Sequence, residues 1–386
     1  MKRKLIGTTA LVVATTFAAS AAVAHPLKLS LGGFASVFVG YAEQDDGYLD
    51  AVSQEVTDVD VKGDNEIHFK AKSMLNNGLT VGAKIEMEAG GRAGAAGDRS
   101  IDEYHISLGG NFGTILAGAD DNALYAVAHR SPHMGGRLFD AALNDGDLAA
   151  GDGWILKPGN ASSGLATAVD TGGDSESISY MSPSIGGLMF AATYMPDADQ
   201  GRNDASPPTG TNTLDAYAVG LAYSAKMNRT MINADVGVLI GDAPNVDEHK
   251  EYQAGLQVSY GGLIFGGGYR MIQRDVPSTF TNPSATDDLY LDSDSWEVGV
   301  GYKRGPYGVA LGYLSTTRDS LAGSAAATAV HEDTTEVVQL TSEYAVGHGV
   351  MLVGGLGYAS YEDGNDTTAA GENSGWVATT GLSLSF

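Results

Sequence analysis

Hydrophobic and polar residues alternate along the last eleven residues of the chain. Trp376, Ala378, Leu382, Leu384 and Phe386 would share one face of an extended segment, and the residues between them are mostly small and polar. A period of two residues predicts a β-strand with one apolar face. About ten such residues cross a thin bilayer as a tilted strand. The alternative interpretation is an edge strand of a soluble β-sandwich. The pattern in the rest of the chain decides between the two.

The same alternation recurs throughout the chain, for example in residues 66–72, 81–88, 252–260, 297–303 and 338–346. In each segment the apolar set would face lipid, and the polar or charged set would line a wet interior. Most tyrosines fall at the ends of the apolar rows and share their direction, which predicts aromatic girdles at the two membrane surfaces. The pattern therefore favours a transmembrane β-barrel over a sandwich.

Two kinds of connection separate these segments. Short turns rich in Gly and Asn have hairpin chemistry, and longer polar stretches lie between them. The turns are at 76–78, 109–111, 185–187, 226–228, 261–262, 304–306 and 347–349. The longer stretches cover about 43–63, 90–99, 120–174, 196–212, 241–249, 274–292, 317–333 and 362–374. Seven turns and eight loops make fifteen connections, which predict an all-β, antiparallel barrel of sixteen strands with short periplasmic turns and long external loops.

The amino-terminal end has the features of a secretory signal peptide. Lys2, Arg3 and Lys4 precede an apolar run from Leu5 to Ala19, and Ala22-Val23-Ala24 is a small-residue cleavage site. This order of features predicts a signal over residues 1–24, with cleavage near Ala24 and export through the periplasm. Residues 25–386 would then form one barrel domain in the outer membrane, because a bilayer does not tolerate unpaired sheet edges.

Composition narrows the function classes. The formal net charge is -25, and the chain has 53 Gly, 18 Tyr and no Cys. The acidic balance argues against nucleic acid as a partner. Without cysteine, no disulfide can stabilise the fold in the oxidising periplasm. A barrel of this kind is expected to contact outer-membrane lipid and lipopolysaccharide, and to pass small hydrophilic solutes and ions.

Two local motifs carry a resemblance to a known family. Gly110-Asn111-Phe112-Gly113-Thr114 is similar to a hairpin that leads into the fifth strand of general bacterial porins, and Leu29 to Phe34 is similar to their first strand. The resemblance extends over residues 25–386 and includes the terminal Phe386. It implies a passive diffusion channel without a cofactor, a homotrimer, and insertion by the barrel assembly machinery through Phe386. It also implies that the long third loop, residues 120–174, folds into the lumen and narrows it.

Charged residues in two parts of the chain are the candidates for such a constriction. The basic wall would consist of Lys28, His68, Lys70, Lys72, Lys84, Arg92 and Arg99. The acidic loop would supply Asp140, Asp145, Asp147 and Asp152. Opposed rows of charge create a field across the pore that orients dipolar solutes. With so acidic a chain, we expect a preference for cations.

Other functions are open for some of these residues. Asn144 to Asp147 and the spacing Asp58, Asp60, Asp64 are reminiscent of Ca²⁺ loops, so Asp145 and Asp147 are candidate ligands, although neither segment has the complete twelve-residue pattern. A hydrolase would need a constellation such as Asp120, Asp121, His129 and His133. The chain has no serine elbow and no HExxH motif, so we do not expect an enzyme. A substrate-specific channel and an adhesin remain as alternatives.

Overall fold

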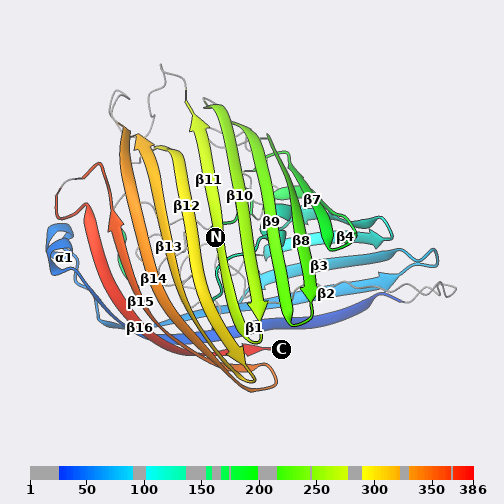
Figure 1. The fold of residues 1–386 in the computed structure, drawn as a ribbon, viewed down its shortest axis with the longest axis horizontal. Helices are drawn as coiled ribbons and strands as arrows, with labels where there is room; N and C mark the ends of the chain where they lie inside the picture. Colours follow the sequence, from blue (N-terminus) through cyan, green and yellow to red (C-terminus); the bar gives the residue numbers. More distant parts are fainter. Residues whose placement is uncertain are drawn as a thin grey trace.

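Sixteen β-strands close into one antiparallel barrel in the described part of a computed structural model of the protein (Figure 1). The structure describes residues 26–89, 101–135, 154–158, 167–173, 175–198, 215–243, 246–276, 289–321, 330–366 and 368–386. Every strand pairs with its neighbours in sequence, and β1 pairs with β16 to complete the ring. The predicted fold class and strand number are confirmed.

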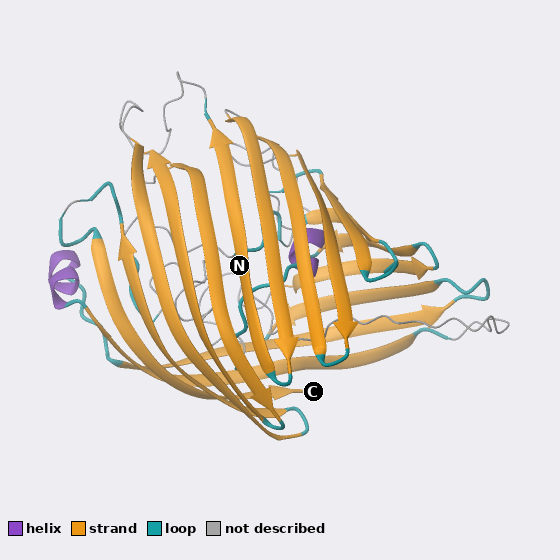
Figure 2. Cartoon of the chain, in the orientation of Figure 1, coloured by secondary structure: helices purple, strands orange, loops and turns teal. Residues whose placement is uncertain are grey.

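The strands are long and the helices are short (Figure 2). The strands are β1 (Lys28–Gln44), β2 (Val59–Met74), β3 (Thr80–Glu88), β4 (Ile101–Gly110), β5 (Gly113–Ala119), β6 (Glu176–Met181), β7 (Leu188–Met195), β8 (Asp215–Met227), β9 (Thr230–Ala243), β10 (Val246–Tyr260), β11 (Leu263–Asp275), β12 (Leu289–Arg304), β13 (Tyr307–Leu321), β14 (Val330–Gly347), β15 (Val350–Glu362) and β16 (Glu372–Ser385). The helices are α1 (Asp46–Val52), which follows β1, and α2 (Ala123–Val127), which follows β5. None of the helices described is long and apolar enough to span a membrane.

The first and last strands meet along most of their length. Phe34 is the register partner of Ser385, and Gln44 is the partner of Gly375 at the other end of the seam. Backbone bonds between Gly33 and Phe386, each 3.1 Å long, extend the pairing to the last residue. Closure satisfies the backbone groups that would otherwise be unpaired at two open sheet edges.

The two faces of the strands differ as the alternation predicts. On β16, Trp376 and Leu382 are exposed on the outside, as is Phe386 directly after the strand, whereas Val377 and Ser383 are buried on the inside. Aromatic side chains on the outside also gather at two levels. Near the long loops, Tyr194 stacks on Tyr217, Trp296 packs on Tyr313, and Tyr41 packs on Trp376. Near the short turns, Tyr307 packs on Tyr344. These two levels are the expected girdles.

The strands extend further into some predicted loops than the sequence indicates. The stretch 241–249 is wrong as a long loop, because β9 continues to Ala243 and β10 begins at Val246. Polar residues of β10 still alternate, and His249 and Glu251 are buried on the inner face. In the same way, β13 continues to Leu321 and β14 begins at Val330. Charge in these segments marks the inner face of long strands rather than a loop.

β1 and β2 approach each other closely at Gly33, whose backbone also bonds to Phe386 across the seam. Gly33 has φ +151, and a Cβ there would lie 2.1 Å from the carbonyl oxygen of Glu66 on β2. We predict that Gly33→Ala destabilises the barrel by about 1–3 kcal/mol, because β1 must shift away from β2. Thermal unfolding in detergent, followed by the heat-dependent shift in gel mobility, measures this. Gly63→Ala on β2 is the control, because its nearest neighbours are 3.5 Å away; equal stability of the two variants would contradict the prediction.

Candidate functional site

The connection between β5 and β6 enters the barrel, and its described segments lie against the inner wall. α2 begins it and packs on the inner faces of β7, β8 and β9. Leu124 of this helix is fully buried against Met195, Ala218 and Leu239. The predicted inward course of residues 120–174 is therefore seen in the parts that the structure describes, residues 120–135, 154–158 and 167–173.

Asn122 ties the outgoing part of this loop to the returning part. Its side-chain oxygen accepts hydrogen bonds from the backbone N–H groups of Leu124 and Tyr125, at 2.9 and 3.1 Å, and so caps α2. Its side-chain amide donates to the carbonyls of Val169 and Thr171, at 2.9 and 3.0 Å. Because Asn122 is fully buried, these bonds form in a low dielectric and hold the loop base together.

Residues 129–135, which we call the outgoing limb, run across the inside of the sheet. The backbone N–H of His129 donates to Asp235 on β9 at 2.6 Å. Further along, Ser131 donates to Glu297 on β12 at 2.7 Å. The end of the limb, at Gly135, donates to Glu343 on β14 at 3.2 Å. The limb therefore crosses from β9 to β14 and is bonded to the wall at both ends and in the middle.

Glycine occupies the inner positions of the wall beneath the loop. These glycines are Gly237 on β9, Gly255 on β10, Gly266 on β11, and Gly299 and Gly301 on β12. A Cβ at Gly255 would lie 2.0 Å from the carbonyl oxygen of His129, and one at Gly266 would lie 2.5 Å from that of Arg130. No side chain fits at either distance. The loop thus rests on the backbone of the strands.

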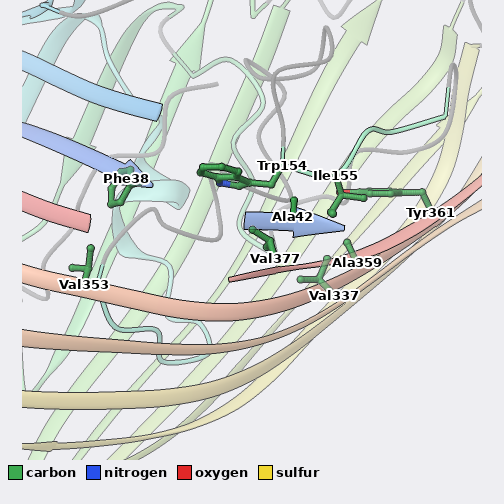
Figure 3. Close-up of a cluster of buried hydrophobic side chains, with 9 residues drawn as sticks. All are labelled: Phe38, Ala42, Trp154, Ile155, Val337, Val353, Ala359, Tyr361 and Val377. Atoms are coloured by element: carbon green, nitrogen blue, oxygen red, sulfur yellow. The ribbon is translucent and has the colours of Figure 1, made fainter. Parts of the chain in front are cut away.

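A hydrophobic contact fixes residues 154–158 on the opposite side of the barrel (Figure 3). Trp154 and Ile155 are buried against Phe38 of β1 and Val377 of β16. Here too glycine makes room, because a Cβ at Gly40 would lie 2.4 Å from the Trp154 ring. The Lys62 ammonium lies 5.0 Å from the centre of the same ring, within the range of a cation–π contact.

Polar bonds complete this attachment. The N–H of Leu156 donates to Gln44 on β1 at 2.9 Å, and Asn373 on β16 donates to the Leu156 carbonyl at 2.6 Å. Burial, with the nearby Arg318, lowers the pKa of Lys157, although Asp333 and Asp363 act in the opposite direction. The middle of the loop is therefore fastened to the seam where the barrel closes.

Residues 167–173, the returning limb, are held by a buried ion network. Arg270 of β11 donates to Glu251 of β10 through Nε at 2.9 Å and through a second guanidinium nitrogen at 2.5 Å. The same guanidinium binds Asp170 at 2.5 Å and the carbonyl of Ala168 at 3.2 Å. Thr171 also donates to Glu251. Arg270 and Glu251 are almost completely buried, so each charge depends on the other for compensation.

The facing wall, formed by β2 to β5, carries many acidic groups at mid-height. Lys84 lies 3.1 Å from Glu86, 3.2 Å from Glu103 and 3.7 Å from Asp120. His68 lies 2.8 Å from Glu66 and 3.3 Å from Glu86. Glu66, Glu86 and Glu103 are buried among these partners. Lys84 and His68, which the sequence assigned to a basic wall, are thus each surrounded by carboxylates.

The other candidates of the basic wall lie closer to the short turns. Lys28 is the register partner of Lys72, and Lys70 is the partner of Lys84. All four have the same parity as the buried Glu66 and Glu86, so they point into the barrel. Arg92, Arg99, Asp140, Asp145, Asp147 and Asp152 lie outside the described residues, and so does the proposed Ca²⁺ segment at 144–147.

The alternative chemistries find little support in the described geometry. Asp120 bonds to His105 on β4, whereas His129 bonds to Asp235 on β9, so these groups do not form one constellation. Asp60 and Asp64 both lie in the extended β2. Four residues of strand span about 13 Å, which is too far for two carboxylates to share one Ca²⁺ through a local loop.

A closed sixteen-strand barrel with a loop fastened inside its lumen is the architecture of an outer-membrane diffusion channel. The sequence profile of Gram-negative porins matches residues 7–364, and the chain belongs to this family. It is a passive channel of the outer membrane, and family and fold indicate a channel rather than an enzyme. Curated proteins show no match to the chain.

Solved structures share the fold at low sequence identity. An anion-selective porin from Comamonas acidovorans is 18% identical, with 94% of this chain and 100% of that chain covered and a TM-score of 0.57. The outer membrane channel DcaP of Acinetobacter baumannii is 14% identical, with 93% and 97% covered and a TM-score of 0.57. The trimer form of OmpT, an outer membrane protein of Vibrio cholerae, is 13% identical, with 94% and 100% covered and a TM-score of 0.55.

The glycines under the outgoing limb lead to a prediction about channel size. We expect Gly255→Ala to lower the single-channel conductance, because the new methyl group pushes the His129 backbone away from the wall and toward the axis. Single-channel recording in planar bilayers measures this. Gly109→Ala on β4 adds the same methyl group to the lumen, but its nearest neighbour is 3.6 Å away. Equal conductance of the two variants would show that the wall at Gly255 does not support the loop.

The ion network leads to a prediction about loop attachment. Arg270→Met leaves Glu251 buried without its guanidinium, which should cost about 3–5 kcal/mol locally and loosen the returning limb. Limited proteolysis and thermal unfolding should both report this loss. The double variant Arg270→Met/Glu251→Gln removes both charges and should recover much of the stability. If the double variant is as unstable as the sum of the two single variants, the pair is not coupled.

Proposed function

We propose that this porin is a cation-preferring channel for small hydrophilic solutes, with its constriction between the inward loop and the β2–β5 wall. The observation that supports the preference most directly is the acid-rich cluster around Lys84. Three carboxylates, from Glu86, Glu103 and Asp120, share that one ammonium group. Carboxylates that line a narrow passage raise the local concentration of cations and lower that of anions.

The loop supports the proposal by making the passage asymmetric in cross-section. It covers the inner faces of β9 to β14 and is fastened again beside β1 and β16. Solutes are then confined to the side of the lumen where β2 to β5 present their charges. Small polar molecules that exchange water for these groups should pass more readily than apolar ones.

Two further proposals concern assembly and export. The OmpT relative has a trimer form, which supports a homotrimer for this chain. The signal features of residues 1–24 support export with cleavage near Ala24, and the exposed Phe386 at the end of β16 would be available to the barrel assembly machinery. A bound Ca²⁺ at Asp145 and Asp147 would order the acidic part of the loop.

The reversal potential under a salt gradient tests the proposed selectivity. We expect cation polarity for the native channel and a smaller potential for Glu66→Gln/Glu86→Gln, because two lumen carboxylates are lost. Glu336→Gln/Glu362→Gln is the matched control. It removes the same charge from the outer face of β14 and β15, where Glu336 bonds to the exposed Tyr313 hydroxyl. Anion polarity of the native channel, or an equal effect of the control pair, would contradict the proposal.

A further inference from the structure

The charges inside the barrel are separated along the channel axis as well as across it. Lys28, Lys70 and Lys72 face the lumen near the short turns, on the adjacent strands β1 and β2. The lysine ion pairs found among the described residues involve none of these three ammonium groups. On β14, three strands from β1 around the ring, Glu343 lies near the short turn and is already paired with Lys303 at 2.5 Å. The periplasmic mouth therefore has a positive zone, which we define as Lys28, Lys70 and Lys72.

Acids dominate from mid-height toward the long loops. Along β2 itself, Lys72 and Lys70 are followed upward by His68, Glu66 and Asp64 on the same inner face. The negative zone, defined as Glu66, Glu86 and Glu103, is buried in this part of the wall. The charge on the inner face of these strands thus changes from positive to negative within a few residues.

The positive zone begins close to the acids and extends well beyond them. Along β2, six residues separate Lys72 from Glu66, which is about 20 Å, and four separate Lys70 from Glu66, which is about 13 Å. Glu86 is nearer to Lys70, because its register partner His68 is two residues from Lys70. The Debye length is about 10 Å at 0.1 M salt and about 3 Å at 1 M. At the lower salt concentration, Lys28 and Lys72 attract their own counterions without cancellation by the acids, and the potential changes sign near Lys70. At the higher concentration, both zones are screened over most of the lumen.

Two opposite zones in series make conduction depend on the direction of the voltage. Cations accumulate in the negative zone and anions in the positive zone. When the long-loop side is positive, cations move toward the lysines and anions toward the acids, so both carriers collect at the boundary. When the voltage is reversed, both carriers are drawn away from the boundary, and it is depleted of ions.

We propose that this porin rectifies, with the larger current when the long-loop side is positive, because Lys28, Lys70 and Lys72 form a positive zone in series with the acids of the mid-lumen. The inference rests on the proposed channel function and goes beyond its ion preference. A cationic solute entering from the long-loop side would be concentrated in the negative zone and would then have to pass the positive zone to reach the periplasm. A small anion entering from the periplasmic side would be concentrated in the positive zone and would then have to pass the negative zone.

The experiment needs channels of known orientation. The chain has no cysteine, so Ala369→Cys, at an exposed position between β15 and β16, gives a single site for biotin on the long-loop side. Streptavidin added to one compartment then reports the orientation of each inserted channel. We expect the current ratio at equal and opposite voltages to be about 1.5 at 0.1 M KCl and close to 1 at 1 M.

Two variants identify the charges responsible. Lys28→Gln/Lys70→Gln/Lys72→Gln should bring the ratio at low salt close to 1 and should increase cation selectivity. Arg229→Gln/Arg304→Gln removes positive charge from periplasmic turns, where Arg229 stacks on the outward Tyr260, and should keep the ratio. The heat-dependent gel shift checks that each barrel is folded.

The possible outcomes separate this inference from the proposed function. Symmetric currents at 0.1 M, a larger current of the opposite polarity, or a ratio that the triple lysine variant leaves unchanged would each overturn the rectification. Cation-polarity reversal potentials in the same recordings would leave the proposed selectivity intact. Anion polarity together with a rectified current would overturn the selectivity and keep the two-zone arrangement.

Discussion

The structure depends on one constraint: every backbone N–H and C=O within the membrane must find its partner inside the protein. The seam between β1 and β16 meets this requirement, and the pairing runs from Phe34 opposite Ser385 to Gln44 opposite Gly375. Once the ring is closed, successive residues of each strand point alternately to the outside and to the inside of the barrel. The apolar set faces lipid and the remainder faces a lumen, so the alternation along each strand also determines what the channel presents to solutes.

A closed ring of this size cannot fill its interior with side chains from the wall, and the long loop takes up part of that space. It does so by two different kinds of contact. Leu124, Trp154 and Ile155 bury apolar surface, which is non-directional and tolerant of small shifts. The contacts of Arg270 with Glu251 and Asp170 are directional and give the returning limb one position. Together these two kinds of contact fix the described segments of the loop at defined positions on the inner wall.

Much of the barrel could be predicted because its signals are local. The outer face of β16 is predicted by the spacing of Trp376, Leu382 and Phe386 alone. The number of strands is predicted by counting the glycine-rich turns and the loops between them. The loop contacts could not be predicted in this way, because Arg270 meets Asp170 only after one hundred residues of chain have folded. Gly255 was recognisable as a lumen position, but the reason for glycine is the His129 carbonyl above it. Likewise, Lys84 looked like part of a basic wall until Glu103 and Asp120 were brought beside it.

The glycines beneath the loop also divide the lumen into two parts with different freedom to change. Where a carbonyl oxygen lies 2.0 Å from the site of a missing Cβ, any larger residue displaces the loop. Inner positions of β9 to β12 are therefore unsuited to adjusting which solutes pass. The inner positions of β1 to β5 carry no such restriction at Lys28, Lys70 or Lys72. New selectivities in this architecture should arise by substitution on that one side, with the opposite side retained as a fixed support.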